Sequence, residues 1–246
     1  MRNIKLILEY DGSRYSGWQR LGKDESENTI ENKLLEVLHK MTGEQAELNC
    51  GSRTEAGVHA YAQVANFKTN TGMKCYEIKN YLNRYLPMDI AITGVEEMPE
   101  RFHASLNAKS KTYLYRIATG DVPSVFDRKY TYYCFHQPNV IHMKEAAKLL
   151  LGKHDFKNFS SVKKGKSTVK EIYLIDINQD PKEIQITIKA NDFLHNMARM
   201  LVSTLLEIGL GNRSMWEIEK ILDPDQPEAG NMPASAQGLF LQEVEY

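Results

Sequence analysis

One short stretch of the sequence combines several side chains that can take part in acid–base or anion chemistry. Residues 50–60 read CGSRTEAGVHA, with a guanidinium, hydroxyls, a carboxylate and an imidazole between two apolar segments that are typical of β-strands. Arg53 and Glu55 are two positions apart, so in extended backbone their side chains leave the chain on the same side. Gly57 permits a backbone turn that a side chain would disfavour. We therefore predict a functional loop or a very polar hairpin.

Each of these residues also has a simpler interpretation. Arg53 and Glu55 could form a surface ion pair, which contributes about 0–1 kcal/mol to stability. His59 could satisfy backbone groups, and we assign it no catalytic role. Ser52, His59 and Glu55 share the side-chain types of a serine hydrolase, but no G-x-S-x-G turn surrounds the serine, so we reject that reaction.

The composition is that of an ordinary globular chain. It has 246 residues, of which 42% are hydrophobic and 26% charged, enough for one large domain or two of half that size. No apolar run approaches the roughly 20 residues that span a bilayer, and the N-terminus does not resemble a signal peptide. The three cysteines are scattered, which excludes a disulfide framework and a paired-cysteine zinc site. We predict a reduced, cytoplasmic protein with no membrane partner.

The net charge is −1, but the charges are segregated along the chain. Residues 24–47 carry seven acidic side chains and two lysines. Residues 101–116 carry four basic side chains and no acid, and residues 153–170 carry six lysines and one aspartate. If the fold keeps these segments apart, we expect an acidic face and a basic groove, the usual footprint of nucleic-acid binding. The alternative is a set of solvated loops.

The hydrophobic pattern predicts two similar halves. In the first half we expect a strand at 4–10, a helix at 29–38, strands at 46–50 and 63–69, a helix at 76–86 and a strand at 90–97. In the second half we expect a strand at 111–119, a helix at 143–151, strands at 169–178 and 183–190, helices at 193–210 and 216–222 and a strand at 239–244. This order is β-α-β-β-α-β twice, which suggests an internal duplication. We predict an α+β fold of two ferredoxin-like halves, residues 1–104 and 105–246, joined into one mixed, mainly antiparallel sheet around a central cleft.

Residues 52–59 resemble motif II of the TruA-type tRNA pseudouridine synthases, which is usually written GRTDAGVH. Two positions differ, because Ser52 replaces a glycine and Glu55 replaces the aspartate that is catalytic in that family. Further family-like segments are YDGS at 10–13, GWQ at 17–19, FHA at 102–104, KTYLY at 111–115, GKHDF at 152–156, FLHNMAR at 193–199 and GLFL at 238–241. They follow one another in the family's order along the whole chain, which makes the resemblance specific.

The resemblance implies the pseudouridine synthase fold and an isomerase that converts uridine to pseudouridine in the anticodon stem-loop of tRNA. It also implies a homodimer that binds tRNA across both subunits, with no cofactor and no metal. Glu55 takes the position of the catalytic carboxylate, and Arg199 that of the arginine that pairs with it. Arg53 assists extrusion of the base, and Leu239 lines the pocket. Tyr113 stacks on the target uracil, an interaction worth about 1–3 kcal/mol per base.

The replacement of aspartate by Glu55 keeps the charge and changes the reach. Two nearby arginines would keep a glutamate ionised at neutral pH. One additional carbon shifts the carboxylate by about 1 Å, and a misplacement of that size can cost about a hundredfold in rate. Ser52 could compensate by altering the backbone three residues earlier. We expect reduced activity if the loop is unshifted.

Two alternatives stay open at this stage. One is a catalytically impaired RNA-binding relative, which would bind tRNA in a salt-dependent manner without turnover. The other is a protein-interaction scaffold, which would not bind tRNA. Among the candidate residues, Tyr113 and Tyr115 could simply belong to the core, whereas Arg199 on an apolar helix requires a carboxylate partner because a buried unpaired charge is very costly.

Overall fold

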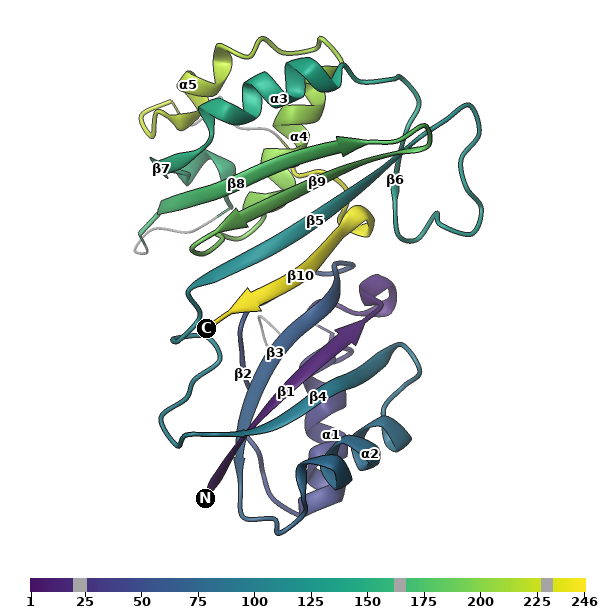
Figure 1. Cartoon of the computed structure of the whole chain (residues 1–246), viewed down its shortest axis with the longest axis vertical. Helices are drawn as coiled ribbons and strands as arrows, with labels where there is room; N and C mark the ends of the chain where they lie inside the picture. Colours follow the sequence, from purple (N-terminus) through teal and green to yellow (C-terminus); the bar gives the residue numbers. More distant parts are fainter. Residues whose placement is uncertain (20–25, 162–166, 227–231) are drawn as a thin grey trace. The chain divides into compact units, whose positions relative to one another are not determined.

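The chain folds into two compact units (Figure 1). The computed structural model describes residues 1–19, 26–161, 167–226 and 232–246. The first unit comprises Met1–Lys109 together with Phe240–Tyr246, and the second comprises Ser110–Leu239. The predicted halves, 1–104 and 105–246, divide the chain near the same point but assign the last strand to the other half. In the structure that strand pairs with the first unit, because its hydrogen-bonding partner is a strand near residue 60.

The first unit has a sheet whose strands run in the order β4-β1-β3-β10. Its elements are β1 (Arg2–Tyr10), α1 (Ile30–Thr42), β2 (Asn49–Cys50), β3 (His59–Thr69), α2 (Cys75–Tyr85), β4 (Ile90–Met98) and β10 (Leu239–Glu245), with a 3-10 turn at Gly12–Arg14. β1 is antiparallel to both β3 and β4, while β2 pairs antiparallel and β10 pairs parallel with β3. The predicted β-α-β-β-α-β order of the first half is confirmed.

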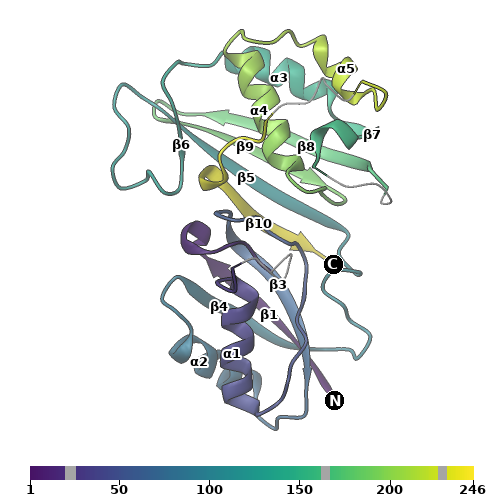
Figure 2. The same ribbon diagram turned by 180° about the vertical axis from the view of Figure 1, so that it is seen from behind.

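The two faces of this sheet differ in character. Ile4, Leu6 and Leu8 are fully buried, and α1 and α2 cover that face, as Figures 1 and 2 show. α1 begins where the Thr29 side chain accepts a hydrogen bond from the Asn32 N–H, and it ends at a left-handed glycine. Because side chains alternate along a strand, the intervening positions of β1 and β3 lie on the opposite face, which is polar toward the start of β1 and the end of β3, at Asn3, Lys5, Asn66 and Lys68.

The second unit has its own strand order, β5-β9-β8-β7. Its elements are β5 (Ser110–Thr119), β6 (Tyr132–Cys134), α3 (Val140–Leu149), β7 (Gly152–Asp155), β8 (Val169–Gln179), β9 (Glu183–Ala190), α4 (Met197–Gly209) and α5 (Glu217–Leu222), with 3-10 turns at Lys157–Phe159 and Ala236–Gly238. β5 with β9, β9 with β8 and β8 with β7 are antiparallel, while β6 runs parallel to β5. The α+β class, with mainly antiparallel pairing inside each unit, is confirmed. The joining of the two halves around a cleft stays a prediction.

The structure corrects several details of the predicted second half. The helix expected from residue 193 begins at Met197, because Asn196 adopts a left-handed conformation with φ 65° and ends the preceding irregular segment. β6 and β7 were not predicted. Part of the charge pattern, including Asp24, Glu25 and the lysines at 163, 164 and 166, lies outside the described residues. No helix within the described ranges is long and apolar enough to cross a membrane.

Candidate active site

The motif loop, residues 51–58, connects β2 to β3 in the first unit. The side chain of buried Gln63 fixes its start, because its amide oxygen accepts from the Ser52 N–H at 3.2 Å and its amide nitrogen donates to the Ser52 carbonyl at 2.5 Å. Among the described non-glycine residues, only Asn196 has a positive φ. Ser52 therefore occupies its position without backbone strain, and a glycine is not required there.

The segment that reads YDGS…GWQ braces this loop from the side. The Trp18 N–H donates to the Thr54 carbonyl at 2.9 Å, and the Gly57 N–H donates to the Tyr15 carbonyl at 3.3 Å. The hydroxyls of Tyr10 and Thr54, both buried, are 2.7 Å apart. Two segments that are far apart in the sequence thus form one structural unit around Glu55.

Glycine is required where the two segments touch. A Cβ atom at Gly12 would lie 2.0 Å from the carbonyl oxygen of Val58, so no side chain fits. Gly17 has φ 90°, and a Cβ atom there would lie 2.8 Å from the Thr54 carbonyl oxygen. The backbone around Glu55 is therefore held by direct approach of main chain to main chain.

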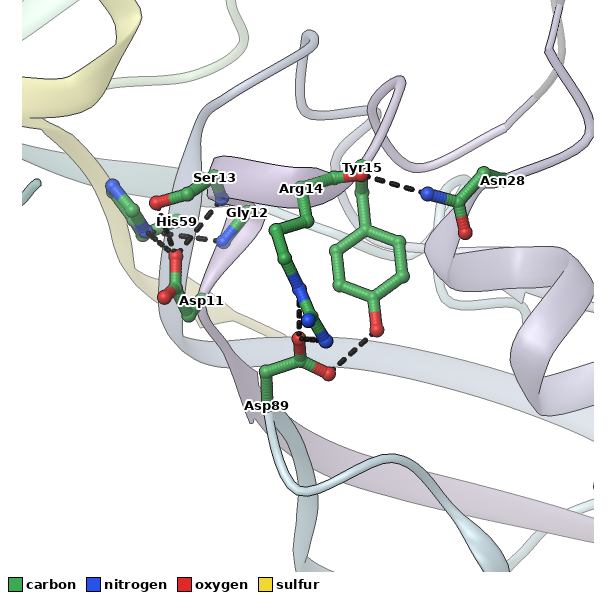
Figure 3. A network of polar contacts seen from close by, with 8 residues as sticks. All are labelled: Asp11, Gly12, Ser13, Arg14, Tyr15, Asn28, His59 and Asp89. Carbon is green, nitrogen blue, oxygen red and sulfur yellow. Dashed lines mark hydrogen bonds and ion pairs between the residues drawn. The ribbon is translucent and has the colours of Figure 1, made fainter.

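His59 closes the loop at the beginning of β3. Figure 3 shows its Nδ1 facing the Gly12 N–H, which donates to it at 3.1 Å, and the Asp11 carboxylate at 3.2 Å. The ring is 1% exposed and stacks on Phe240 with 4.7 Å between ring centroids. This geometry agrees with the interpretation that His59 satisfies backbone groups.

A second polar network in Figure 3 holds the other side of the same turn. Asp89 accepts from the Arg14 guanidinium at 2.7 Å and from the Tyr15 hydroxyl at 2.6 Å. The Asn28 amide donates to the Arg14 carbonyl at 2.7 Å. Burial raises the pKa of Tyr15, and its hydrogen bond to Asp89 acts in the same direction. The bracing segment is thus tied to the residues that precede α1 and β4.

Glu55 and Arg53 differ in exposure within the loop. Glu55 is half-buried, and its carbonyl accepts from the Val58 N–H at 3.1 Å, whereas Arg53 is exposed. Arg53 acts on Glu31, which is half-buried in the first turn of α1: burial raises the pKa of Glu31, and the positive charge of Arg53 opposes that rise. Glu31 was not among the predicted residues, because no spacing rule relates a helix position to a loop 22 residues later.

Arg199 lies near the start of α4 in the second unit and is half-buried. Its Nε donates to the Ala234 carbonyl at 2.6 Å and its Nη1 donates to Asn196 Oδ1 at 3.1 Å. In turn, the Ala234 N–H donates to the Arg199 carbonyl at 3.1 Å. These contacts orient the guanidinium, and the left-handed conformation of Asn196 places one of the acceptors.

Tyr113 and Tyr115 lie on one face of β5, as predicted, and both are buried. Tyr113 is 6% exposed and meets Phe193 edge-on, with 4.9 Å between ring centroids. The Tyr115 hydroxyl donates to the Ser235 carbonyl at 2.8 Å. Leu239 is buried at the start of β10. The burial of Tyr113 is what the core interpretation expects, and its role as a stacking platform stays a prediction.

A charge cluster beside Tyr113 was not predicted. Asp192 Oδ1 and Oδ2 accept from Lys111 Nζ at 2.5 Å and from Lys170 Nζ at 2.7 Å. Burial raises the pKa of Asp192, but the two ammonium charges and their hydrogen bonds outweigh it, so the pKa is lowered. Lys111 precedes Tyr113 by two residues and Asp192 precedes Phe193, so the cluster borders the aromatic pair. Pairing between strands, which the sequence alone does not reveal, brings these charges together.

Each unit thus supplies part of the predicted site. The first contributes Arg53 and Glu55, and the second contributes Arg199, Tyr113 and Leu239. That the two sets meet in one pocket stays a prediction. A half-buried carboxylate on a rigid loop is suited to attack or deprotonation at a bound substrate, and an oriented guanidinium is suited to binding an anion.

Comparison with known proteins gives a consistent result. A family model described as tRNA pseudouridine synthase matches residues 6–107 and 146–246. A Bacillus anthracis protein named tRNA pseudouridine synthase A 2 is 46% identical over 247 residues, which cover 100% of both chains. Proteins named tRNA pseudouridine synthase A 1 from Clostridium tetani and tRNA pseudouridine synthase A from Bacillus sp. strain KSM-64 are 44% and 43% identical over 248 residues, again covering 100% of both chains.

Proposed function

Because this chain belongs to the tRNA pseudouridine synthase A family, we propose that Glu55 is the carboxylate with which it isomerises uridine to pseudouridine in tRNA. The reaction breaks the bond between N1 of uracil and C1′ of ribose, turns the base and joins C5 to C1′. The C5 proton leaves and N1 gains one, so the atoms balance without an oxidant or a reductant. The full-length similarity to proteins of this name is the observation that carries the proposal.

The local geometry of the first unit supports Glu55 in this role. The loop is fixed by the Trp18–Thr54 and Gly57–Tyr15 hydrogen bonds on either side of the carboxylate, so Glu55 has a defined position before substrate binds. Arg53 is exposed and therefore accessible to the RNA that must open when the uridine turns out of its stack.

The second unit is proposed to supply the groups that hold the carboxylate and the base. Arg199 would pair with Glu55, and its bonds to Ala234 and Asn196 support this role by fixing the guanidinium in advance. Leu239 would line the pocket. Tyr113 would stack on the uracil; because it is buried, the base must enter beside Phe193, the half-buried ring in contact with it.

The test of Glu55 is tritium release from tRNA that carries [5-³H]uridine, with the wild type, Glu55→Asp and Glu55→Gln compared. We expect Glu55→Gln to lose about a thousandfold or more in rate, because it removes the charge and the proton acceptor. The rate of Glu55→Asp should differ from the wild-type rate by about a hundredfold. The rate should be higher than that of the wild type if the loop backbone is placed for an aspartate. Equal rates for Glu55→Asp and the wild type would reject the importance of side-chain length.

The alternative of an impaired RNA-binding relative gains no support from the comparisons. It predicts tRNA binding without tritium release from the wild type or from Glu55→Asp, and that result would reject the synthase activity. We further propose that the target lies in the anticodon stem-loop and that the protein acts in the cytoplasm as a homodimer. Mapping of pseudouridine in modified tRNA tests the first point, and the mass of the protein in solution tests the dimer.

A further inference from the structure

The first unit has a polar hollow of about 440 Å³ that is not part of the site described above. Its lining residues come from β2, β3 and the connection from β4 to β5, namely Asn49, Asn66, Lys68, Glu100, Arg101, Phe102 and His103. In the strand register Asn49 lies opposite Asn66, and Lys68 lies opposite Asn3. These positions alternate with the buried residues under α1 and α2, so the hollow lies on the polar face of the sheet.

The wall of the hollow is fixed by two buried asparagines. The amide nitrogen of Asn3, which is 1% exposed, donates to the Pro99 and Phe102 carbonyls at 3.1 and 2.8 Å. The amide oxygen of Asn66, which is 2% exposed, accepts from the Ala104 N–H at 2.8 Å. These bonds hold residues 99–104 against the sheet, so the lining side chains start from a rigid backbone.

His103 is set up as a hydrogen-bond donor. Its Nδ1 accepts from the Ser105 N–H at 3.2 Å and from the Leu106 N–H at 3.3 Å. This arrangement assigns the proton of the neutral ring to Nε2, which leaves that nitrogen as the donor. Phe102 beside it packs against Tyr246 with 5.0 Å between ring centroids.

The cations of the hollow differ from neighbouring basic residues of the same unit in making no ion pair within the described residues. Lys68 and Arg101 are exposed, and in the described part of the chain neither makes an ion pair. On the same unit, Arg2 and Lys5 pair with glutamates of β4 at 2.8 and 2.7 Å. Glu100 is the acid among the lining residues. The lining residues thus carry two cations and one acid, and this net positive charge beside a neutral donor is suited to an anion.

We propose that this hollow binds a phosphate of the tRNA backbone, away from the nucleotide that reacts. The inference rests on the proposed function for the identity of the RNA. The Arg101 guanidinium can bind a phosphate through two parallel hydrogen bonds, Lys68 adds a point charge, and His103 Nε2 and the Asn49 amide are neutral donors. Such a contact fixes how the tRNA lies on the protein and carries no information on base sequence.

The experiment measures tRNA binding over a series of salt concentrations for the double variant Lys68→Gln/Arg101→Gln. Loss of a phosphate contact reduces the slope of log K against log salt by about one per contact, so we expect a slope smaller by about 1 to 2. At about 0.1 M salt the affinity should fall about tenfold. In turnover, KM should rise by a similar factor while kcat at saturating tRNA stays unchanged.

The matched control is Lys40→Gln/Arg84→Gln, which makes the same charge change on α1 and α2, the helices that cover the other face of the sheet. We expect binding within about threefold of the wild type and an unchanged slope. Glu100→Gln provides a test of opposite sign, because removal of the acid should tighten binding about twofold.

A Lys68→Gln/Arg101→Gln protein that melts like the wild type and binds tRNA with the same slope as the Lys40→Gln/Arg84→Gln control overturns the proposal. Weaker binding after Glu100→Gln also contradicts it. Failure of the proposed function can be told apart from failure of this proposal, because only the former removes tritium release from the wild type. The binding measurements do not depend on turnover, so the hollow can be supported or rejected in either case.

Discussion

The loop around Glu55 and the strand that carries Tyr113 are positioned by different kinds of contact. In the first unit, main chain touches main chain at Gly12 and Gly17, and backbone hydrogen bonds flank the carboxylate. In the second unit, Tyr113 lies beside an ion-paired cluster at Asp192, and Arg199 is held by a carbonyl and an amide. The loop should therefore be sensitive to added volume, and the second unit to loss of charge or of a hydrogen bond.

The largest effect on stability is expected at Gly12, which sets the approach of the two segments in the first unit. In Gly12→Ala the new methyl would lie 2.0 Å from the Val58 carbonyl oxygen, so the loop backbone must move. We expect the free energy of unfolding to fall by about 3 kcal/mol and tritium release to fall about a hundredfold. Chemical denaturation and the tritium assay measure the two effects.

The control for that variant is Gly72→Ala, where nothing lies within 4 Å of the new Cβ. We expect a change in unfolding free energy of less than about 0.5 kcal/mol. Similar losses at Gly12 and Gly72 would show that the first unit is sensitive to any added methyl, and the contrast between the two units would fail.

The next effect concerns the charge cluster of the second unit. Asp192→Asn leaves Lys111 and Lys170 without their carboxylate. Because the Asp192 side chain is 41% exposed, we expect a loss of about 2 kcal/mol at pH 7, below the roughly 3–5 kcal/mol of a fully buried pair. Asp176→Asn, at an exposed position of β8, is the control and should change the unfolding free energy by less than about 0.5 kcal/mol.

The same variant gives a pH dependence with a defined sign. Despite burial, the two lysines hold the pKa of Asp192 below its ordinary 3.8, so the carboxylate stabilises the fold above that pH. The contribution is lost as the pH falls through the folded-state pKa. Denaturation between pH 2.5 and 7 should therefore show the wild type and Asp192→Asn converging below pH 3.8. A difference in unfolding free energy that stays constant down to the lowest pH would contradict a stabilising role of the ionised Asp192 carboxylate.

A smaller effect is expected at Asn196, where the backbone is left-handed. Asn196→Ala should lower the unfolding free energy by about 1–2 kcal/mol, because asparagine, with its short polar side chain, tolerates positive φ better than alanine does. Asn196→Gly should keep the stability but remove the acceptor of the Arg199 hydrogen bond, so its tritium release should still fall. If both variants keep full activity, Asn196 does not position Arg199.

The smallest effect tests whether side-chain hydrogen bonds also matter in the first unit. Thr54→Val keeps the shape but removes the hydroxyl 2.7 Å from the Tyr10 hydroxyl. We expect a loss of about 1 kcal/mol in urea denaturation. Thr93→Val, at an exposed position of β4, removes a hydroxyl that donates to the Ile7 carbonyl at 3.1 Å; because water can replace that bond, we expect a change of less than about 0.5 kcal/mol. A loss at Thr54 as large as that at Gly12 would mean that the loop does not depend mainly on close backbone packing.

The sequence predicted the elements that have a strong hydrophobic period. Strand β1 follows from the alternation of apolar side chains at Ile4, Leu6 and Leu8. Helix α4 follows from an apolar segment of helical length. β7, at Gly152–Asp155, has no such period and is defined by pairing with β8. The start of α4 was misplaced because the left-handed conformation of Asn196 interrupts an otherwise apolar segment.

The candidate site was predictable where chemistry is local in the sequence. Residues 52–59 and their resemblance to a known motif make Glu55 and Arg53 candidates, and their roles stay predictions. The contacts around these two residues were not predictable, because they join distant segments: Gly12 with Val58, and Arg53 with Glu31. The pairing of Asp192 with Lys111 beside Tyr113 was not predictable for the same reason. Only the strand register and the packing of turns bring such pairs together.

The pairing of β10 with β3 has a consequence for synthesis of the protein. The first unit needs Phe240–Tyr246, yet the ribosome makes all of Ser110–Leu239 before those residues emerge. During translation one edge of β3 therefore lacks its parallel neighbour, and an open strand edge invites pairing with other nascent chains. The strands of the second unit have all been synthesised before Phe240–Tyr246. We therefore expect the second unit to complete its fold before the first unit, although the first unit begins earlier in the sequence.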